Sequence, residues 1–316
     1  MLKKINVAVI GTGNMGRNHV RVYSEMKNCK LIAICDIDFD TMNKISQEFH
    51  CKGYLDYKEM LEKEKIDAVS IAVPTKSHKE IAVYCLNKNI NTFLEKPIAY
   101  TTQEANEILK VANQSKGKFT VGHIERFNPA VLQLDKLVKK GRLGKILSIN
   151  AKRLGPYIPK KRDTGVILDI AVHDIDIINF LMNRLPKEIY ANGGNLINNY
   201  LDDYADIFLK YDDFSAYVQV NWISPLKIRE LSVTGTKGFA KLNYITQDLE
   251  FYKRSEKKIV ANKTAEPVIV KIKKQEPLKF ELEYFISMIS KGKKNMMTGK
   301  EARDALDITI KALNKI

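Results

Sequence analysis

The sequence predicts an α/β protein with two domains. The first is an N-terminal parallel sheet covered by helices on both faces, and the second is an α+β domain with a mostly antiparallel open sheet. Over residues 1–123, short apolar runs rich in β-branched residues alternate with helix-like stretches, whereas later strands follow one another without helices between them. The length of 316 residues fits two domains at roughly 150 residues each. We therefore expect domains at 1–123 and 124–316, and we allow for the C-terminal helix packing back on the first.

The first 123 residues read as repeated strand–helix units. Thr101 and Thr102 precede Glu104, which is a helix N-cap signal, and apolar residues then recur at helical spacing. Strands are expected at 5–10, 30–35, 68–73, 91–94 and 119–122, and helices at 14–26, 40–49, 57–64, 78–87 and 101–115.

The pattern changes after Gly122. Asp212 and Asp213 separate two alternating runs and predict a hairpin turn. One of these runs has Ala216, Val218, Val220 and Trp222 on one face, from which we expect a homodimer or homotetramer formed through the sheet. The expected helices are 128–140, 165–183, 277–290 and 299–313, and the expected strands are 188–191, 204–211, 215–222, 227–234, 238–244 and 248–252.

Composition narrows the class of protein. No apolar run approaches the roughly 20 residues of a membrane span, and the short N-terminal run passes into a glycine loop without a cleavage site, so we expect a cytoplasmic protein. The four cysteines form no C-x-x-C pair and lie at no zinc-finger spacing, so we expect reduced thiols and no metal site. The net charge of +15 fits either a nucleic acid or an anionic small molecule. The absence of nucleic-acid-binding motifs favours a phosphate-bearing small molecule.

A glycine motif follows the first predicted strand and opens a helix. Gly11-Thr12-Gly13-Asn14-Met15-Gly16 is the G-x-G-x-x-G of dinucleotide-binding Rossmann domains. Its glycines permit a tight turn, approach of a pyrophosphate to the backbone, and close packing of helix on strand. Twenty residues after Gly16, Asp36 ends the second strand, where a carboxylate accepts ribose hydroxyls and repels a 2′-phosphate. The motif predicts NAD rather than NADP.

Two further groups of residues could carry chemistry. Glu95-Lys96-Pro97 follows a strand end, where open α/β sheets bind ligands, although a lone lysine there is more often a surface residue. Asp169 and His173 are four residues apart, which places both on one face of the predicted helix. They could be a satisfied core pair or a functional acid/base pair, and the lack of a third ligand disfavours a metal.

Together these residues resemble the Gfo/Idh/MocA (glucose–fructose oxidoreductase/inositol dehydrogenase) family. The matching motifs are Gly11–Gly16, Pro74-Thr75 with His78, Glu95-Lys96-Pro97, and Asp169 to His173-Asp174, in the family's order. The chain departs from the family before Asp169, where many members have a glycine run.

The resemblance implies NAD-linked oxidation or reduction of a secondary hydroxyl on a sugar or cyclitol. Lys96 would hydrogen-bond the reacting oxygen, His173 would be the general acid/base, and Asp169 would orient the imidazole or hold a neighbouring hydroxyl. Pro74, Thr75, His78 and Glu95 would border the cofactor.

Two stretches resemble the branch of the family that acts on UDP-N-acetylglucosamine or its uronate and oxidises the 3-hydroxyl. One runs from Val121 to Pro129, and the other runs from Arg153 to Arg162 through Tyr157. Because a diphosphate needs cations, Arg153 and Arg162 are candidate ligands, with solvated charge as the alternative. Arg126 could contact substrate or the nicotinamide amide. The alternatives are a myo-inositol or free-sugar dehydrogenase, a non-catalytic NAD-binding regulator, and a nucleic-acid-binding module.

Overall fold

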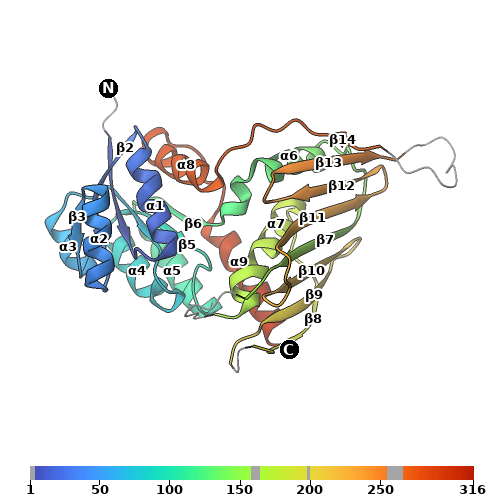
Figure 1. The fold of residues 1–316 in the computed structure, drawn as a ribbon, viewed down its shortest axis with the longest axis horizontal. Coiled ribbons are helices and arrows are strands. Elements are labelled where there is room, and N and C mark those ends of the chain that lie inside the picture. The colour runs from blue at the N-terminus through green and yellow to red at the C-terminus, as the bar shows by residue number, and fades with distance from the viewer. Residues whose placement is uncertain (1–3, 158–163, 198–199, 255–265) are drawn as a thin grey trace. The chain divides into compact units, whose positions relative to one another are not determined.

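A computed structural model describes residues 4–157, 164–197, 200–254 and 266–316 (Figure 1). The chain divides into two compact units. Unit 1 contains Met1–Ile124 and Leu278–Arg303, and unit 2 contains Glu125–Pro277 and Asp304–Ile316. The chain thus returns to unit 1 late in the sequence, which a division into 1–123 and 124–316 does not capture.

Unit 1 is built on a six-stranded sheet in the order β3-β2-β1-β4-β5-β6, and every pairing is parallel. The order reverses between β1 and β4, which is where doubly wound sheets bind ligands. The strands are β1 (Ile5–Ile10), β2 (Cys29–Cys35), β3 (Lys52–Tyr54), β4 (Ala68–Ile71), β5 (Asn91–Glu95) and β6 (Phe119–Gly122).

The connections of unit 1 are helices, as the alternating pattern predicted. They are α1 (Asn14–Glu25), α2 (Phe39–Phe49), α3 (Tyr57–Lys63), the 3-10 turn η1 (Thr75–Ser77), α4 (His78–Asn87) and α5 (Thr102–Gln114). The predicted cap is confirmed, since the Glu104 amide donates to Thr101 Oγ1 at 3.1 Å. The prediction missed β3, which has only three residues, one of them glycine.

Helix α8 (Pro277–Lys291) completes the core of unit 1. Leu282 and Phe285 are buried with residues of β1, α1 and α2, and the ring of Phe285 lies 5.6 Å from that of Phe93 on β5. Beyond α8, Asn295 donates to the Phe119 carbonyl at 2.9 Å and accepts from the Thr120 hydroxyl at 3.1 Å. The late segment is therefore an integral part of this unit.

Unit 2 contains an eight-stranded sheet in the order β14-β13-β12-β11-β7-β10-β9-β8. Only the pairing of β7 with β10 is parallel among these neighbours. The strands are β7 (Ile146–Leu154), β8 (Glu188–Gly194), β9 (Tyr204–Lys210), β10 (Ser215–Asn221), β11 (Ile228–Gly235), β12 (Gly238–Asn243), β13 (Asp248–Lys253) and β14 (Val268–Ile269).

Strand β7 was not predicted, although it lies near the middle of this sheet. Its alternation runs against the simple rule that apolar side chains face inward, because Arg153 is buried and Leu147 is 45% exposed. The two-residue strand β14 was also missed. The predicted hairpin turn at Asp212 and Asp213 is confirmed, since the Tyr211 amide donates to the Phe214 carbonyl across it.

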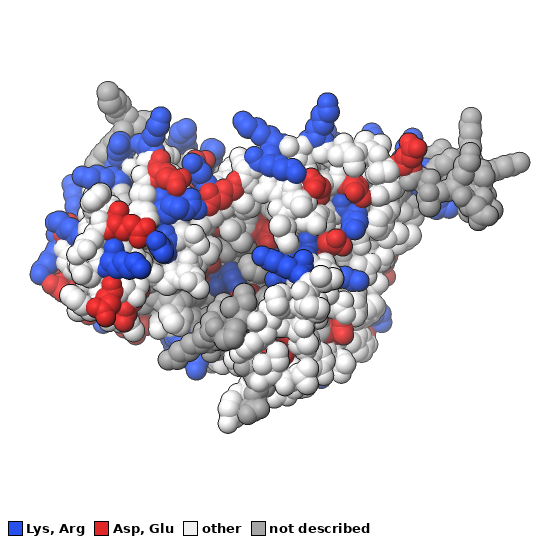
Figure 2. Space-filling view, in the orientation of Figure 1, with Lys and Arg blue, Asp and Glu red and all other residues white. Residues whose placement is uncertain are grey.

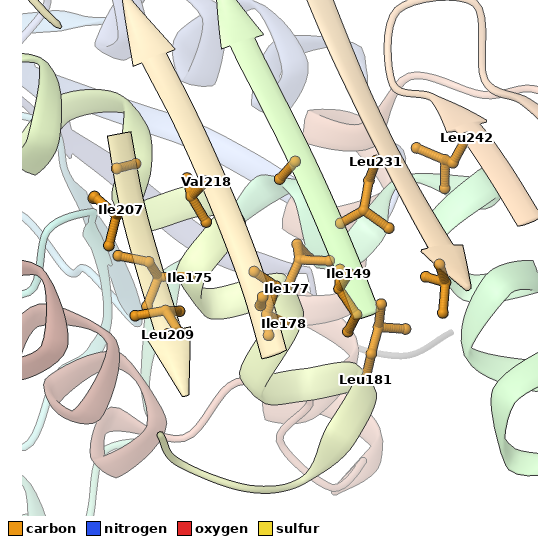
Figure 3. Close-up of a cluster of buried hydrophobic side chains, with 14 of the residues drawn as sticks. Ile149, Ile175, Ile177, Ile178, Leu181, Ile207, Leu209, Val218, Leu231 and Leu242 are labelled. Atoms are coloured by element: carbon orange, nitrogen blue, oxygen red, sulfur yellow. The ribbon is translucent and has the colours of Figure 1, made fainter. Parts of the chain in front are cut away.

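One face of this sheet packs against helices. Its core includes side chains from α6 (Pro129–Lys139), α7 (Val172–Met182) and α9 (Gly299–Leu313). Figure 3 shows Ile175, Ile178 and Leu181 of α7 beneath the inward residues of the strands. The layer covers the apolar row expected to form the oligomer interface, because Ala216, Val218, Val220 and Trp222 are all buried in this core.

The opposite face of the sheet is the open one. Tyr190 pairs with Phe208 across β8 and β9, and Phe208 pairs with Tyr217 across β9 and β10, so an aromatic row crosses three strands. Tyr190 is 54% exposed and Phe208 is 40% exposed. The prediction therefore chose the wrong face: the exposed apolar surface lies on the alternate residues of the same strands.

Candidate active site

The glycine loop adopts the geometry that its motif predicted. Gly11 has φ +85°, a left-handed conformation that glycine adopts far more readily than other residues. A Cβ on Gly16 would lie 1.8 Å from the Gly11 carbonyl oxygen, so this glycine allows the helix to pack closely on the loop. A Cβ on Gly13 would meet nothing within 4 Å and would project into open space. Gly13 thus leaves room at the start of α1, where unpaired amides and the helix dipole favour a phosphate.

Asp36 closes the same edge of the sheet. Its Oδ2 accepts from the Thr12 amide at 2.7 Å and the Thr12 hydroxyl at 2.8 Å, while its Oδ1 accepts from the Asp38 amide at 3.0 Å. A carboxylate has about four acceptor positions, so capacity for ribose hydroxyls remains. The residues of the loop and this carboxylate therefore fit the adenosine and pyrophosphate parts of a dinucleotide.

The Glu95-Lys96-Pro97 turn follows β5 at the same edge. Glu95 is buried and accepts from the Lys96 amide at 3.2 Å through Oε2, and Lys96 itself is partly exposed. His78, at the start of α4, lies with Nδ1 2.8 Å from the Pro97 carbonyl oxygen and Nε2 3.0 Å from that of Val73. The imidazole thus connects the loops that follow β4 and β5.

The other predicted cofactor residues lie on the first of these two loops. Pro74 precedes η1, and Thr75 is buried at its first position. Because β1, β4 and β5 are parallel neighbours, the glycine loop, the Pro74 loop and the Lys96 turn all emerge at one edge of the sheet.

In unit 2, Asp169 and His173 lie on one continuous helical segment that begins as a π-helix (η3, Ile167–Ala171) and continues as α7. Both residues are half-buried. The start of the segment is fixed by Asp202, whose Oδ2 accepts from the Ile167 amide at 2.7 Å. Burial raises the pKa of Asp202, and the Ile167 amide partly offsets this. π-helical turns occur often at functional sites.

Two arginines predicted to bind substrate make buried ion pairs instead. Arg153 on β7 donates through Nε and Nη2 to Asp174, at 2.8 and 3.0 Å, and through Nη1 to Glu125 at 2.8 Å. Arg126, which is 1% exposed, donates to both carboxylate oxygens of Asp176 at 2.7 and 2.8 Å. These contacts give both guanidinium groups structural partners, so the geometry gives no support to the phosphate-binding role predicted for Arg153 or to the substrate or nicotinamide contact predicted for Arg126.

The electrostatics of this cluster follow from the same contacts. Burial by itself would lower the pKa of Arg153, but the Asp174 and Glu125 carboxylates outweigh it and raise this pKa well above its usual value. The guanidinium also lies 4.6 Å from the ring centre of Tyr244. Arg229 on β11 lies opposite Arg153 in the strand register. Burial lowers the pKa of Arg229 most, and repulsion from the Arg153 guanidinium lowers it further.

Of the remaining predicted substrate residues, the structure describes Tyr157. Tyr157 is partly buried against the unit 2 core, and Arg162 falls outside the described residues. Arg229 was not predicted, and its Nη1 donates to the carbonyls of Leu154 and Ile228. Within the described ranges, no carboxylate lies within ion-pair distance of Arg229.

The sequence prediction also gave no positioning role to several residues that hold the others in place. Asp174 and Asp176 were visible as charges in an apolar helix, which should have pointed to buried partners. His19 on α1 is completely buried, with Nε2 2.9 Å from Glu95 Oε1. The position of His19 on the apolar face of the glycine-loop helix could have indicated a buried partner. No sequence pattern indicated a role for Asp202, which lies in a loop far along the chain.

Models of one family match both parts of the chain. Residues 5–123 match an oxidoreductase family with an NAD-binding Rossmann fold (GFO_IDH_MocA), and residues 131–241 match the GFO/IDH/MocA C-terminal domain. The chain belongs to the GFO/IDH/MocA family. It is therefore an NAD-binding oxidoreductase, as the glycine motif and Asp36 predicted, and the family resemblance is confirmed. In the described part of this family member, no helix is long and apolar enough to cross a membrane.

Relatives within the family have several activities. A UDP-N-acetylglucosamine 3-dehydrogenase of Acidithiobacillus ferrooxidans is 24% identical over 90% of this chain and 89% of its own length. A 2,7-anhydro-N-acetylneuraminate hydratase of Mediterraneibacter gnavus is 28% identical over 77% and 68%, and an inositol 2-dehydrogenase of Rhizobium meliloti is 27% identical over 68% and 65%. The solved structure of the Acidithiobacillus enzyme has a TM-score of 0.89 at 22% identity, covering 100% of this chain and 98% of that one, which confirms the fold.

Proposed function

We propose that this protein oxidises a secondary hydroxyl of a sugar with NAD as the hydride acceptor. The observation that carries the proposal is the edge of the unit 1 sheet, where the glycine loop, Asp36 and the Lys96 turn emerge together. A lysine that follows β5 at this edge is suited to act beside the reactive end of a dinucleotide whose pyrophosphate lies at the start of α1.

In this mechanism the side chains bind and move the hydroxyl proton. Lys96 donates a hydrogen bond to the reacting oxygen and stabilises the negative charge that develops on it. His173 accepts the hydroxyl proton as general base, and Asp169 on the same helix orients the imidazole or holds a neighbouring hydroxyl. Bound NAD would supply the acceptor for the hydride, and the protein supplies position and electrostatics.

The substrate that we favour is UDP-N-acetylglucosamine or its uronate, oxidised at the 3-hydroxyl. The likeness to the Acidithiobacillus enzyme over nine-tenths of the chain supports this substrate. The buried ion pairs of Arg153 weaken one argument for it, namely that this arginine binds the diphosphate. Arg162 and Arg229 remain as candidate ligands. The likeness to inositol 2-dehydrogenases supports the alternative, a myo-inositol or free-sugar dehydrogenase.

An NAD-reduction screen at 340 nm tests the activity. The panel contains UDP-N-acetylglucosamine, its uronate, UDP-glucose, myo-inositol and free sugars. We expect turnover of a UDP-sugar, and preferential turnover of myo-inositol would instead establish the alternative. No turnover of any secondary alcohol together with tight NADH binding would indicate a non-catalytic NAD-binding regulator.

Lys96→Met and His173→Ala test the assigned roles. Each should lower kcat by at least about 100-fold, as expected for loss of a general acid/base or of an oxyanion-stabilising donor. NADH binding should stay within a few-fold of the wild-type value. Wild-type turnover by Lys96→Met would refute the mechanism.

We also propose that two or four copies associate through the open face of the unit 2 sheet. The aromatic row of Tyr190, Phe208 and Tyr217, in which Tyr190 and Phe208 are exposed, supports this face as the contact surface. Basic and acidic side chains are interspersed on the molecular face that Figure 2 shows, which gives no support there to a nucleic-acid partner. Light scattering at micromolar concentration should give a dimeric or tetrameric mass, and Phe208→Glu should lower it.

A further inference from the structure

A buried histidine connects the glycine-loop helix to the turn that carries Lys96. His19 lies on α1, three residues after Gly16, and is 0% exposed. Its ring packs edge-on against Phe93 of β5, with the ring centres 5.3 Å apart. The same ring reaches past Phe93 to the end of β5, where Nε2 lies 2.9 Å from Glu95 Oε1.

The Glu95 carboxylate divides its two oxygens between helix and turn. Oε1 faces His19, and Oε2 accepts from the Lys96 amide. Gly122 on β6 leaves room for this carboxylate, since a Cβ there would lie 3.1 Å from Oε1. The carboxylate therefore holds the backbone at Lys96 only while the imidazole holds the carboxylate.

The surroundings of the imidazole favour one of its two tautomers. His19 Nδ1 is buried with no hydrogen-bond partner in the described structure, and an unpaired N–H in an apolar site is less tolerated than an unpaired acceptor. The proton of a neutral imidazole is thus placed on Nε2, which donates to Glu95. Glu95 then accepts one hydrogen bond through each oxygen, from the imidazole at Oε1 and from the Lys96 amide at Oε2.

The other side of Lys96 is held by the second buried histidine. His78 lies against the Pro97 carbonyl, as described above, so the residues immediately before and after Lys96 both contact an imidazole. The two histidines come from α1 and α4, whose first residues follow the loops at the cofactor edge of the sheet. The Lys96 turn is therefore held by the same two helices that follow the cofactor-binding loops.

We propose that His19 is a positioning residue that sets Lys96 relative to the bound dinucleotide by holding the Glu95 carboxylate. This role rests on the proposed function of Lys96. The buried imidazole of His19 acts through Glu95 and not by direct contact with substrate or cofactor. The role differs from a general contribution to stability because it affects the rate of the chemical step.

Three variants separate positioning from stability. His19→Phe keeps an aromatic ring against Phe93 but removes the hydrogen bond to Glu95. His19→Gln keeps an N–H donor that can reach the carboxylate. Tyr23→Phe is the matched control, because Tyr23 lies one turn further along α1, is equally buried, and loses a 2.7 Å bond to Ser70 on β4 without touching the Lys96 turn.

Amide hydrogen exchange at Lys96, measured in the full chain with NADH bound, reads out the proposal without any substrate. Exchange at this amide should be at least about tenfold faster in His19→Phe, close to wild type in His19→Gln, and unchanged in Tyr23→Phe. Equal exchange in all three variants overturns the proposal, whatever the enzyme acts on. Should His19→Phe fail to fold, Glu95→Gln, which removes the anion from the other side, must show the same faster exchange.

Turnover of whichever substrate the wild-type enzyme accepts gives the second readout. We expect His19→Phe to lower kcat by about 10- to 100-fold, the range for a small misplacement of a catalytic group, with NADH affinity and the KM for NAD within about threefold. His19→Gln should restore most of kcat. Unchanged kcat in His19→Phe, with turnover abolished by Lys96→Met, overturns the positioning role and leaves the proposed function intact. Unchanged turnover in Lys96→Met refutes the proposed function instead.

Discussion

The Lys96 turn of unit 1 and the arginine cluster of unit 2 both bury polar side chains, but they hold them by different means. Around Lys96, imidazole rings contact one carboxylate and backbone carbonyls, and Lys96 is partly exposed. In unit 2, Arg126 and Arg153 are buried against carboxylates of α7 and, for Arg153, also against Glu125. The difference teaches that hydrogen bonds from imidazole rings hold the backbone around Lys96, whereas ion pairs within unit 2 hold its buried guanidinium groups.

The largest effect should come from breaking an internal pair. Arg153→Met leaves Asp174, which is 0% exposed, and Glu125 without their cation, and should destabilise the protein by about 3–5 kcal/mol. Urea unfolding followed by circular dichroism measures this. Arg17→Met is the control, since its pair with Glu48 is exposed and is worth less than about 1 kcal/mol. A loss below about 1 kcal/mol for Arg153→Met would remove the contrast between the two regions.

The glycine loop should separate cofactor binding from stability. Gly13→Ala adds a methyl group in open space, so its stability should stay within about 0.5 kcal/mol of wild type while NADH binding weakens by about tenfold or more. Gly16→Ala should lose both, because its Cβ would collide with the Gly11 carbonyl oxygen. Fluorescence titration with NADH and thermal unfolding measure the two effects. Undiminished binding by Gly13→Ala would contradict a pyrophosphate at this loop.

Asp36 should decide between the two dinucleotides. Asp36→Ala removes the predicted acceptor for the ribose hydroxyls and the charge that repels a 2′-phosphate, so NADH affinity should fall by about 10-fold, equivalent to roughly 1.4 kcal/mol, and the preference over NADPH should shrink. Parallel titrations with NADH and NADPH measure this. Asp40→Ala, an exposed acidic residue at the start of α2, should change neither affinity. If Asp36→Ala keeps the wild-type preference for NADH over NADPH, other residues determine that preference.

An effect that is absent at neutral pH concerns a neutral group buried in unit 1. Burial raises the pKa of the Cys85 thiol from 9.0 to about 12, so the native state keeps a proton that the unfolded chain releases between these values. This contribution is complete below pH 9 and is lost as the pH rises toward 12, at about 1.4 kcal/mol per pH unit. The free energy of unfolding of Cys85→Ala should therefore fall less steeply over that window than that of wild type. Identical slopes would show that this thiol is not protected.

The sequence predicts most of unit 1 because its local signals agree with its tertiary structure. Buried parallel strands are continuous apolar runs, and Gly11, Gly13 and Gly16 each do what the backbone requires of them. In strand β7 the local signal and the tertiary structure disagree, because a buried arginine occupies an inward position of the strand.

The contacts that could not be predicted share a cause. An arginine has the same sequence signature whether its partner is a phosphate or an aspartate elsewhere in the chain, so Arg126 and Arg153 could not be assigned from their type. The row from Ala216 to Trp222 showed that one face of β10 is apolar, but it carried no information on which face the helices cover. His19 and Asp202 act through residues distant in sequence, and only the fold brings them together.

The return of the chain to unit 1 has a consequence for synthesis on the ribosome. When residue 124 leaves the exit tunnel, all six strands of the parallel sheet exist, but Leu282, Phe285 and Ile286, which fill its core, have not yet been translated. More than half of the polypeptide must still be synthesised before these side chains can cover the apolar surface of the N-terminal segment. We expect chaperones to bind the exposed surface during that interval.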